Sequence, residues 1–256
     1  MFGRKGLNQA APQPRPQSSP AEHPSHEAVL NTLRREEAAG NINVRAQLAG
    51  RVLFDDLYFR IAQPERGTRI EDLLAILGAC GGFACIVAVH YTLKLSGQSP
   101  KDIGMMVAEG RDGRTYYFGD VPNTLLLESE HALLSLALGA AHGLGAPVTL
   151  ERVHAVMKHV AATVGTEEFG ASRIAEPHRP VLPMREAIAA YWPAAKEALD
   201  LYQVLPQRRP SAFGFAVQIA MERAKDVLDP LLAADIVTDA AVPAAKIDPK
   251  DFGFAP

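Results

Sequence analysis

The chain has 256 residues, of which 48% are hydrophobic and 21% are charged, and its formal net charge at pH 7 is −3. These values are close to globular averages, and a chain of this length forms one large or two modest domains. A chain so close to neutrality has no overall field that would draw it to nucleic acid or to an acidic membrane, so we expect neither as a partner.

The first 24 residues are rich in Pro, Gln, Ala and Ser and hold little apolar surface. Such a composition predicts a disordered N-terminal arm, residues 1–24, followed by a single helical domain over 25–256. The basic start Met1–Lys5 is not followed by an apolar stretch, so it does not resemble a secretory signal. The two cysteines, Cys80 and Cys85, form no disulfide framework, which favours a reducing compartment and a cytoplasmic location.

Helical patterns follow the arm. Ser25 can cap a helix that ends near Ala39, and Leu53, Leu57 and Ile61 repeat with helical spacing within a second helix at about 47–62. Residues 68–71, Thr-Arg-Ile-Glu, have the pattern of a capping box and predict the start of a third helix that continues to about Leu95.

The third helix contains seventeen uncharged, apolar residues in a row, 73–89. Such a stretch lies either in a protein core or in a bilayer, where a spanning helix needs about 20 apolar residues. Glycines and many alanines make residues 70–95 less hydrophobic than a typical membrane span, so we predict a buried core helix. A membrane-associated protein anchored by residues 73–95 remains the alternative.

The next segment changes character. Asp112-Gly113 separates two short runs of β-type residues, which predicts a small β-hairpin near 103–119. An isolated hairpin is only marginally stable, so we expect it to lie against the helices.

Further helices are predicted at about 124–144, 149–164, from Pro183, at 211–228 and from Asp229 onward. The fold class is therefore mostly α, a multi-helix bundle of about eight helices with one β-hairpin insert. Gly78 and Gly82, like Gly139 and Gly143, stand four residues apart, and we expect their two helices to touch across these glycines.

The stretch 166–182 has no helical or strand pattern, and connections of this length are often functional. Arg173 and Arg179 supply cations, and His178 titrates near neutrality. These three residues are our candidate ligand-binding site, and the chemistry suits a small anionic ligand. The alternative is a simple connector across one end of the bundle.

Two Glu-x-x-His pairs, Glu128/His131 and Glu151/His154, resemble the ligand pattern of di-iron bundles. On two consecutive antiparallel helices, however, the pairs would miss each other by roughly 10 Å. We therefore predict no metal site, and the absence of nucleotide-binding and nucleophile motifs leads us to expect no cofactor.

The residues do not identify an activity, and whether the protein is an enzyme stays open. The favoured hypothesis is a non-catalytic helical binding or scaffold protein that self-associates as a homo-oligomer. The main alternative is a small-molecule enzyme or anion-binding protein that uses the 166–182 loop.

Overall fold

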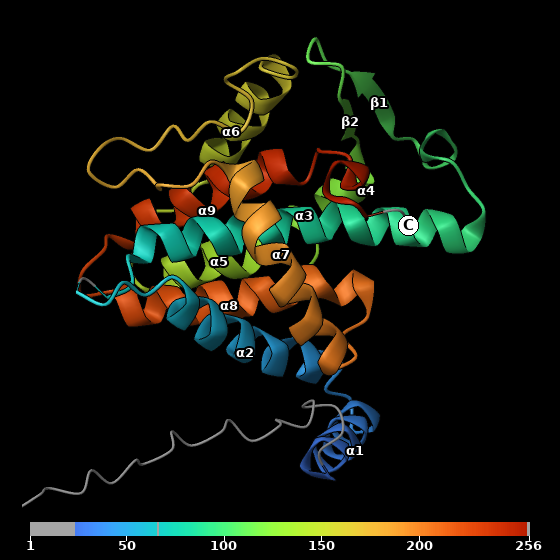
Figure 1. Ribbon diagram of the computed structural model, residues 1–256, viewed down its shortest axis with the longest axis vertical. Helices are drawn as coiled ribbons and strands as arrows, with labels where there is room; N and C mark the ends of the chain where they lie inside the picture. The colour runs from blue at the N-terminus through green and yellow to red at the C-terminus, as the bar shows by residue number, and fades with distance from the viewer. Residues whose placement is uncertain (1–23, 66, 255–256) are drawn as a thin grey trace, which may run out of the picture.

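The computed structural model describes residues 24–65 and 67–254, and most of them lie in helices around one central helix (Figure 1). The predicted arm, residues 1–24, lies outside these described residues except for Pro24, where the first helix begins. The α-helices are α1 (Pro24–Ala38), α2 (Val44–Arg60), α3 (Ile70–Ser96), α4 (Asp120–Asn123), α5 (Leu133–Gly143), α6 (Leu150–Ala162), α7 (Met184–Leu201), α8 (Arg209–Ala224) and α9 (Pro230–Ala244). The strands are β1 (Met106–Glu109) and β2 (Thr115–Phe118). The predicted fold class, a mostly α bundle with one hairpin, is confirmed.

Helix α3 is the core of the bundle. It crosses the middle of the molecule, α7, α8 and α9 pack directly against it, and α2 and α5 pack on α8 (Figure 1). Every residue from 73 to 90 is buried. Among the described helices, α3 alone is long and apolar enough to cross a membrane, and its most apolar stretch is entirely enclosed by the other helices. The apolar run is thus a core helix, as predicted.

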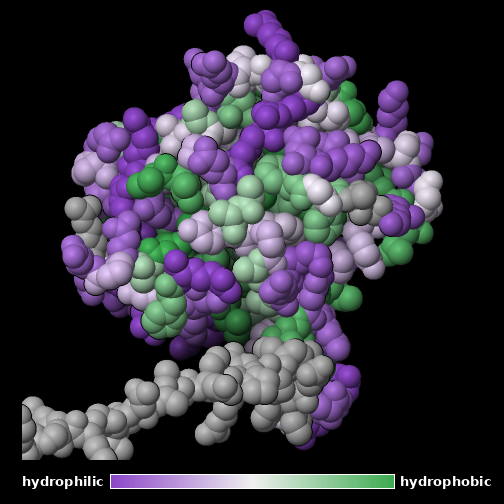
Figure 2. Space-filling model, viewed as in Figure 1, coloured by the Kyte–Doolittle hydropathy of each residue, from purple (hydrophilic) through white to green (hydrophobic). Residues whose placement is uncertain are grey.

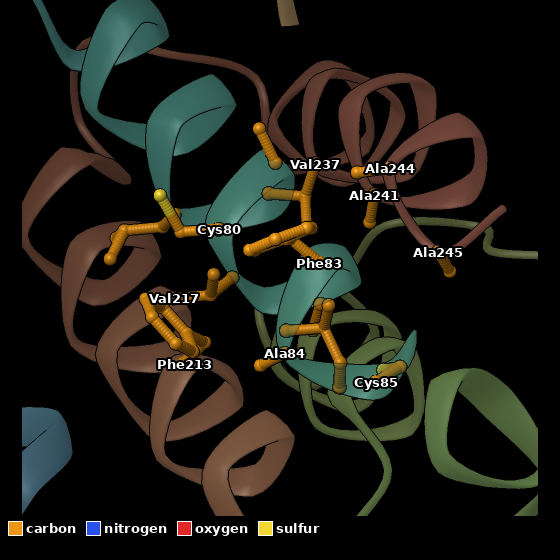
Figure 3. Close-up of a cluster of buried hydrophobic side chains, with 14 of the residues drawn as sticks. Cys80, Phe83, Ala84, Cys85, Phe213, Val217, Val237, Ala241, Ala244 and Ala245 are labelled. Atoms are coloured by element: carbon orange, nitrogen blue, oxygen red, sulfur yellow. The ribbon is translucent and has the colours of Figure 1, made fainter. Parts of the chain in front are cut away.

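The contact between α3 and α9 depends on glycine. A methyl group at Gly78 would lie 2.7 Å from the carbonyl oxygen of Val237, and one at Gly82 would overlap the backbone of Ala241. Figure 3 shows Val237 and Ala241 beside the middle of α3. The predicted contact with Gly139 and Gly143 is wrong, because both glycines lie on the exposed face of α5, where a methyl group would meet no neighbouring atom within 4 Å.

The predicted helix at 124–144 is interrupted. Helix α4 leads into a π-helical turn (Thr124–Glu128), and α5 begins only at Leu133. Ser135 Oγ donates to the carbonyl oxygens of Leu127 and Ser129, at 2.5 and 3.0 Å. These bonds engage carbonyl groups at the break, and serine hydroxyls commonly compete with helical bonding in this way.

The hairpin forms at the expected place. Strands β1 and β2 are antiparallel with Glu109 opposite Thr115, and Gly113 in the turn has a φ of 72°. The segment after α9 contacts β2 through an isolated β-bridge, in which the Tyr117 amide donates to the Lys246 carbonyl oxygen over 2.8 Å. The hairpin therefore lies against the rest of the bundle, as its small size requires.

Candidate ligand cavity beneath the strap

The connection between α6 and α7, residues 163–183, contains no helix or strand and is called the strap here. It contacts the start of α3 and the C-terminal half of α9 and appears at the upper left of Figure 1. The predicted absence of regular structure over 166–182 is therefore correct. Since the three candidate site residues all lie in the strap, their contacts decide what the strap does.

Arg173 holds the strap on α9. Its backbone N–H and its Nε both donate to the carboxylate of Asp239, each over 2.8 Å. The Asp239 side chain is only 7% exposed, whereas that of Arg173 is 38% exposed. A buried carboxylate that accepts two such bonds is well satisfied, so these contacts tie the strap to α9.

His178 holds the strap on the start of α3. Its Nδ1 lies 2.8 Å from Glu71 Oε1, and the neighbouring Pro177 carbonyl accepts a hydrogen bond of 2.6 Å from Arg69. Asp72 adds a third contact, since its Oδ1 accepts from the Val181 amide over 2.7 Å. The acidic residues at the start of α3 therefore bind the strap.

These contacts replace the capping box predicted at the same place. Thr68 Oγ1 donates to the Tyr58 carbonyl oxygen over 2.7 Å, and no side chain caps α3. Glu71 is directed to His178 and Arg69 instead of the helix amides. The capping prediction is wrong because tertiary partners compete successfully for both side chains.

Of the three predicted site residues, Arg179 lines the cavity beneath the strap. Its Nε donates to the Ile174 carbonyl oxygen over 3.1 Å, and its Nη1 lies 3.6 Å from a carboxylate oxygen of Glu176. Both side chains of that ion pair are more than half exposed. Such a pair contributes little stability, so the guanidinium can exchange Glu176 for another anion at small cost.

The cavity beside Arg179 has a volume of about 570 Å³ and is called the strap cavity. Helices α3, α7 and α9 and the strap supply mostly apolar walls. The apolar lining includes Ala75, Phe169, Ala171, Leu182, Met184, Ala187, Ile236 and Ala240. The polar lining consists of Glu167, Ser172, Arg179, Arg185 and Asp239. This combination, apolar walls with few polar groups, is typical of small-molecule sites.

Arg185, in the first turn of α7, is the site residue that the sequence did not reveal. Its Nη1 donates to Asp251 over 2.9 Å, and its guanidinium lies 6.0 Å from the centre of the Phe252 ring. Its Nη2 is buried and has no hydrogen-bond partner among the described residues. The same guanidinium acts to lower the pKa of Tyr116, although burial raises that pKa overall. Asp251 is 66 residues away in sequence, so no local pattern marks Arg185.

Among the described residues, the lining of the cavity contains one hydroxyl group, that of Ser172. Ser172 accepts a hydrogen bond of 3.2 Å from the Ile174 amide and has no hydrogen bond to a base. Among the residues that the structure describes, no three His, Cys, Asp or Glu side chains lie close enough together to bind a metal ion. The groups present are suited to holding a ligand.

A second cavity, of about 580 Å³, lies between the turn before α2, the turn before α5 and the start of α8. Its lining is largely polar and includes Asn41, Asn43, Glu130 and His131. Arg208, its one arginine, donates to Asn43 Oδ1 over 3.2 Å. With fewer apolar walls, this cavity resembles a ligand site less closely than the strap cavity does.

Comparison with known proteins adds no relative to these observations. No protein-family model matches the chain, and neither a curated protein nor a solved structure shows significant similarity to it.

Proposed function

We propose that this protein is a non-catalytic binding protein whose strap cavity holds a small ligand with an apolar body and one anionic group. The single observation that carries the proposal is the joining of apolar walls from three helices to two arginines in one cavity of about 570 Å³. Cavities of roughly 300–1,000 Å³ are the usual size of small-molecule sites.

The arginines give the proposal its charge preference. A guanidinium has five N–H donors. Arg179 uses Nε for the strap backbone and shares Nη1 with the exposed Glu176, and Arg185 uses Nη1 for Asp251. Donors of Arg179 therefore remain for a carboxylate or phosphate, which guanidinium groups bind through short, charge-assisted bonds. Glu167, also on the cavity wall, disfavours a ligand with more negative charge than the arginines can balance.

The experiment uses three probes of equal chain length: octanoate, octanol and octylamine. Isothermal titration calorimetry and thermal unfolding should show saturable binding of octanoate, weaker binding of octanol and the weakest binding of octylamine. The order follows from the charge of the arginines, while the shared alkyl chain tests the apolar walls.

Variants then locate the site. Arg179→Gln should weaken octanoate binding by about tenfold and leave octanol binding unchanged, because it removes one charge-assisted contact. Arg60→Gln is the matched control: its side chain is 52% exposed, against 51% for Arg179, and it pairs with Asp56 away from the cavity. Equal affinity of the wild-type protein for octanoate and octanol, or an unchanged Arg179→Gln variant, would contradict the proposal.

A further inference from the structure

Three helix ends meet at the left of Figure 1: the end of α2, the start of α3 and the end of α8. They form a groove of about 360 Å³. We call it the end patch and define it by Tyr58, Phe59, Ile70, Ala224 and Val227. Phe59 is 73% exposed and Val227 is 78% exposed, so two large hydrophobic side chains stand in solvent beside a groove.

The aromatic residues of the end patch form a continuous series from the core to the surface. Phe54 is buried and its ring stacks on that of Tyr58 at 5.8 Å between centroids. Tyr58 in turn contacts Phe59 edge to face at 5.6 Å. Phe59 thus contacts a ring that is itself stacked on the core, while most of its own surface remains exposed. Exposed aromatic side chains held in this way are typical anchors of protein interfaces.

The surroundings show why this patch is distinct. On the face shown in Figure 2, hydrophobic residues occur in several separate groups divided by charged and polar ones. Exposed hydrophobic side chains that occur singly need no explanation. In the end patch, by contrast, exposed side chains of this kind border a groove that other apolar residues line.

The charges of the groove indicate the partner. Arg223 and Asp55 both line it. Arg223 is exposed and forms no ion pair within the part of the chain that the structure describes, whereas Asp55 contacts only Arg51, at 3.3 Å between half-exposed side chains. A groove that carries one cation and one anion is complementary to itself when a two-fold axis relates two copies, since each residue then meets its opposite.

We propose that two copies of this chain pair through their end patches about a two-fold axis. Phe59 of each copy enters the groove of the other, and Arg223 of each copy faces Asp55 of the other. The inference is independent of the strap cavity, whose lining shares no residue with the end patch. It assigns a surface to the self-association that the sequence favoured.

Sedimentation velocity from low to several hundred micromolar protein tests the proposal. The wild-type chain should form a reversible dimer. Phe59→Ser should weaken dimerisation by about tenfold or more, because an aromatic anchor at the centre of an interface contributes a large share of the binding energy. Leu95→Ser is the matched control, since Leu95 is 69% exposed near the end of α3, away from the patch, and its substitution should change nothing. Circular dichroism of each variant checks the fold.

A charge reversal identifies the occupant as a second copy. Arg223→Asp alone should weaken the dimer, because it places two carboxylates together, and Asp55→Arg alone should weaken it likewise. The double variant Arg223→Asp/Asp55→Arg should recover most of the lost affinity. A wild-type chain that stays monomeric throughout, or a dimer that neither Phe59→Ser nor the charge variants affect, would overturn the proposal. A chain that stays monomeric would indicate that the end patch binds a different protein.

Discussion

The two halves of α3 accommodate polar side chains in opposite ways. At its N-terminal end, Glu71 and Asp72 bind the strap near the surface, and an open cavity lies beside these contacts. At its C-terminal end, His90 is buried beneath the hairpin in contact with the ring of Tyr117, at 4.6 Å between centroids. Tyr117 donates to the buried Asp248 over 3.3 Å. The strap side is thus partly solvated and open, and the hairpin side is closed.

The closed side contains two groups with shifted pKa values, Tyr117 in the hairpin and Lys246 beneath it. Burial lowers the pKa of Lys246, beneath the hairpin, to about 8, and burial raises that of Tyr117 to about 12. Groups with such shifts are ordinarily candidates for an active site. Lys246, however, is 4% exposed, donates to Asn123 Oδ1 over 2.5 Å and does not line the strap cavity. Both shifted groups therefore lie outside the cavity that we propose as the ligand site.

The largest expected effect tests the close packing of α3 against α9. Gly82→Ala should lower the free energy of unfolding by about 3 kcal/mol or more, because the new methyl group overlaps the backbone of Ala241 on α9. The identical change at Gly139, which lies in open space on α5, should raise it by about 0.5–1 kcal/mol through helix propensity. Urea unfolding followed by circular dichroism measures both. Equal effects at the two glycines would contradict the close approach of α3 and α9.

A second test concerns the closed side. The pKa of Lys246 is about 8 in the folded protein, below its ordinary value of 10.5, so between these values the unfolded chain binds more protons. The contribution of Lys246 to stability should therefore rise with pH in this window, by about 2 kcal/mol from pH 8 to about pH 10. Burial raises the pKa of the Cys80 and Cys85 thiols above their ordinary value, and these groups oppose the rise above about pH 9 because the unfolded thiols ionise first. Above about pH 10 the raised pKa of Tyr117 opposes the rise, because the unfolded tyrosine ionises first.

Lys246→Met removes the buried amine while keeping a side chain of similar length. The unfolding free energy of the wild-type protein minus that of the variant, measured by urea titration at several pH values, should rise by about 2 kcal/mol between pH 8 and about pH 10. A variant with the same pH dependence as the wild-type chain would show that Lys246 is not the group responsible.

The smallest expected effect concerns the open side. Asp239→Asn keeps the shape of the side chain but removes the charge that Arg173 binds. It should lower the free energy of unfolding by only about 1–2 kcal/mol, because Arg173 is partly solvated. The loss should be local: trypsin should cut the strap after Arg173, which precedes Ile174, faster in the variant, while α3 stays protected from hydrogen exchange. Unchanged cleavage would mean that the ion pair does not hold the strap.

Much of the fold could be predicted because its signals are local. The spacing of Leu53, Leu57 and Ile61 indicates α2, the uncharged run 73–89 indicates a core helix, and Asp112-Gly113 indicates the hairpin turn. The break between the π-helical turn and α5 was missed because the bonds of Ser135 to the carbonyl groups there depend on tertiary arrangement as much as on sequence.

The candidate site could be predicted only in part, because its geometry depends on contacts between side chains that are far apart in the sequence. The strap was recognised by its lack of pattern, and Arg179 does line the cavity. Arg173 and His178 contact partners that lie 66 and 107 residues away in the sequence, so no local pattern could predict these contacts. The same reason hid Arg185, whose chemistry depends on Asp251 and on a cavity that several helices build together.

The most direct test of the assignment uses calorimetry at neutral pH to measure how octanoate binds to two variants. One is changed near the C-terminal end of α3 and the other in the strap cavity near its N-terminal end. We expect Lys246→Met to bind octanoate as the wild-type protein does, and Arg179→Gln/Arg185→Gln to lose most of the affinity. Loss of binding in Lys246→Met with retention in the double arginine variant would place the ligand beneath the hairpin and contradict the assignment to the strap cavity.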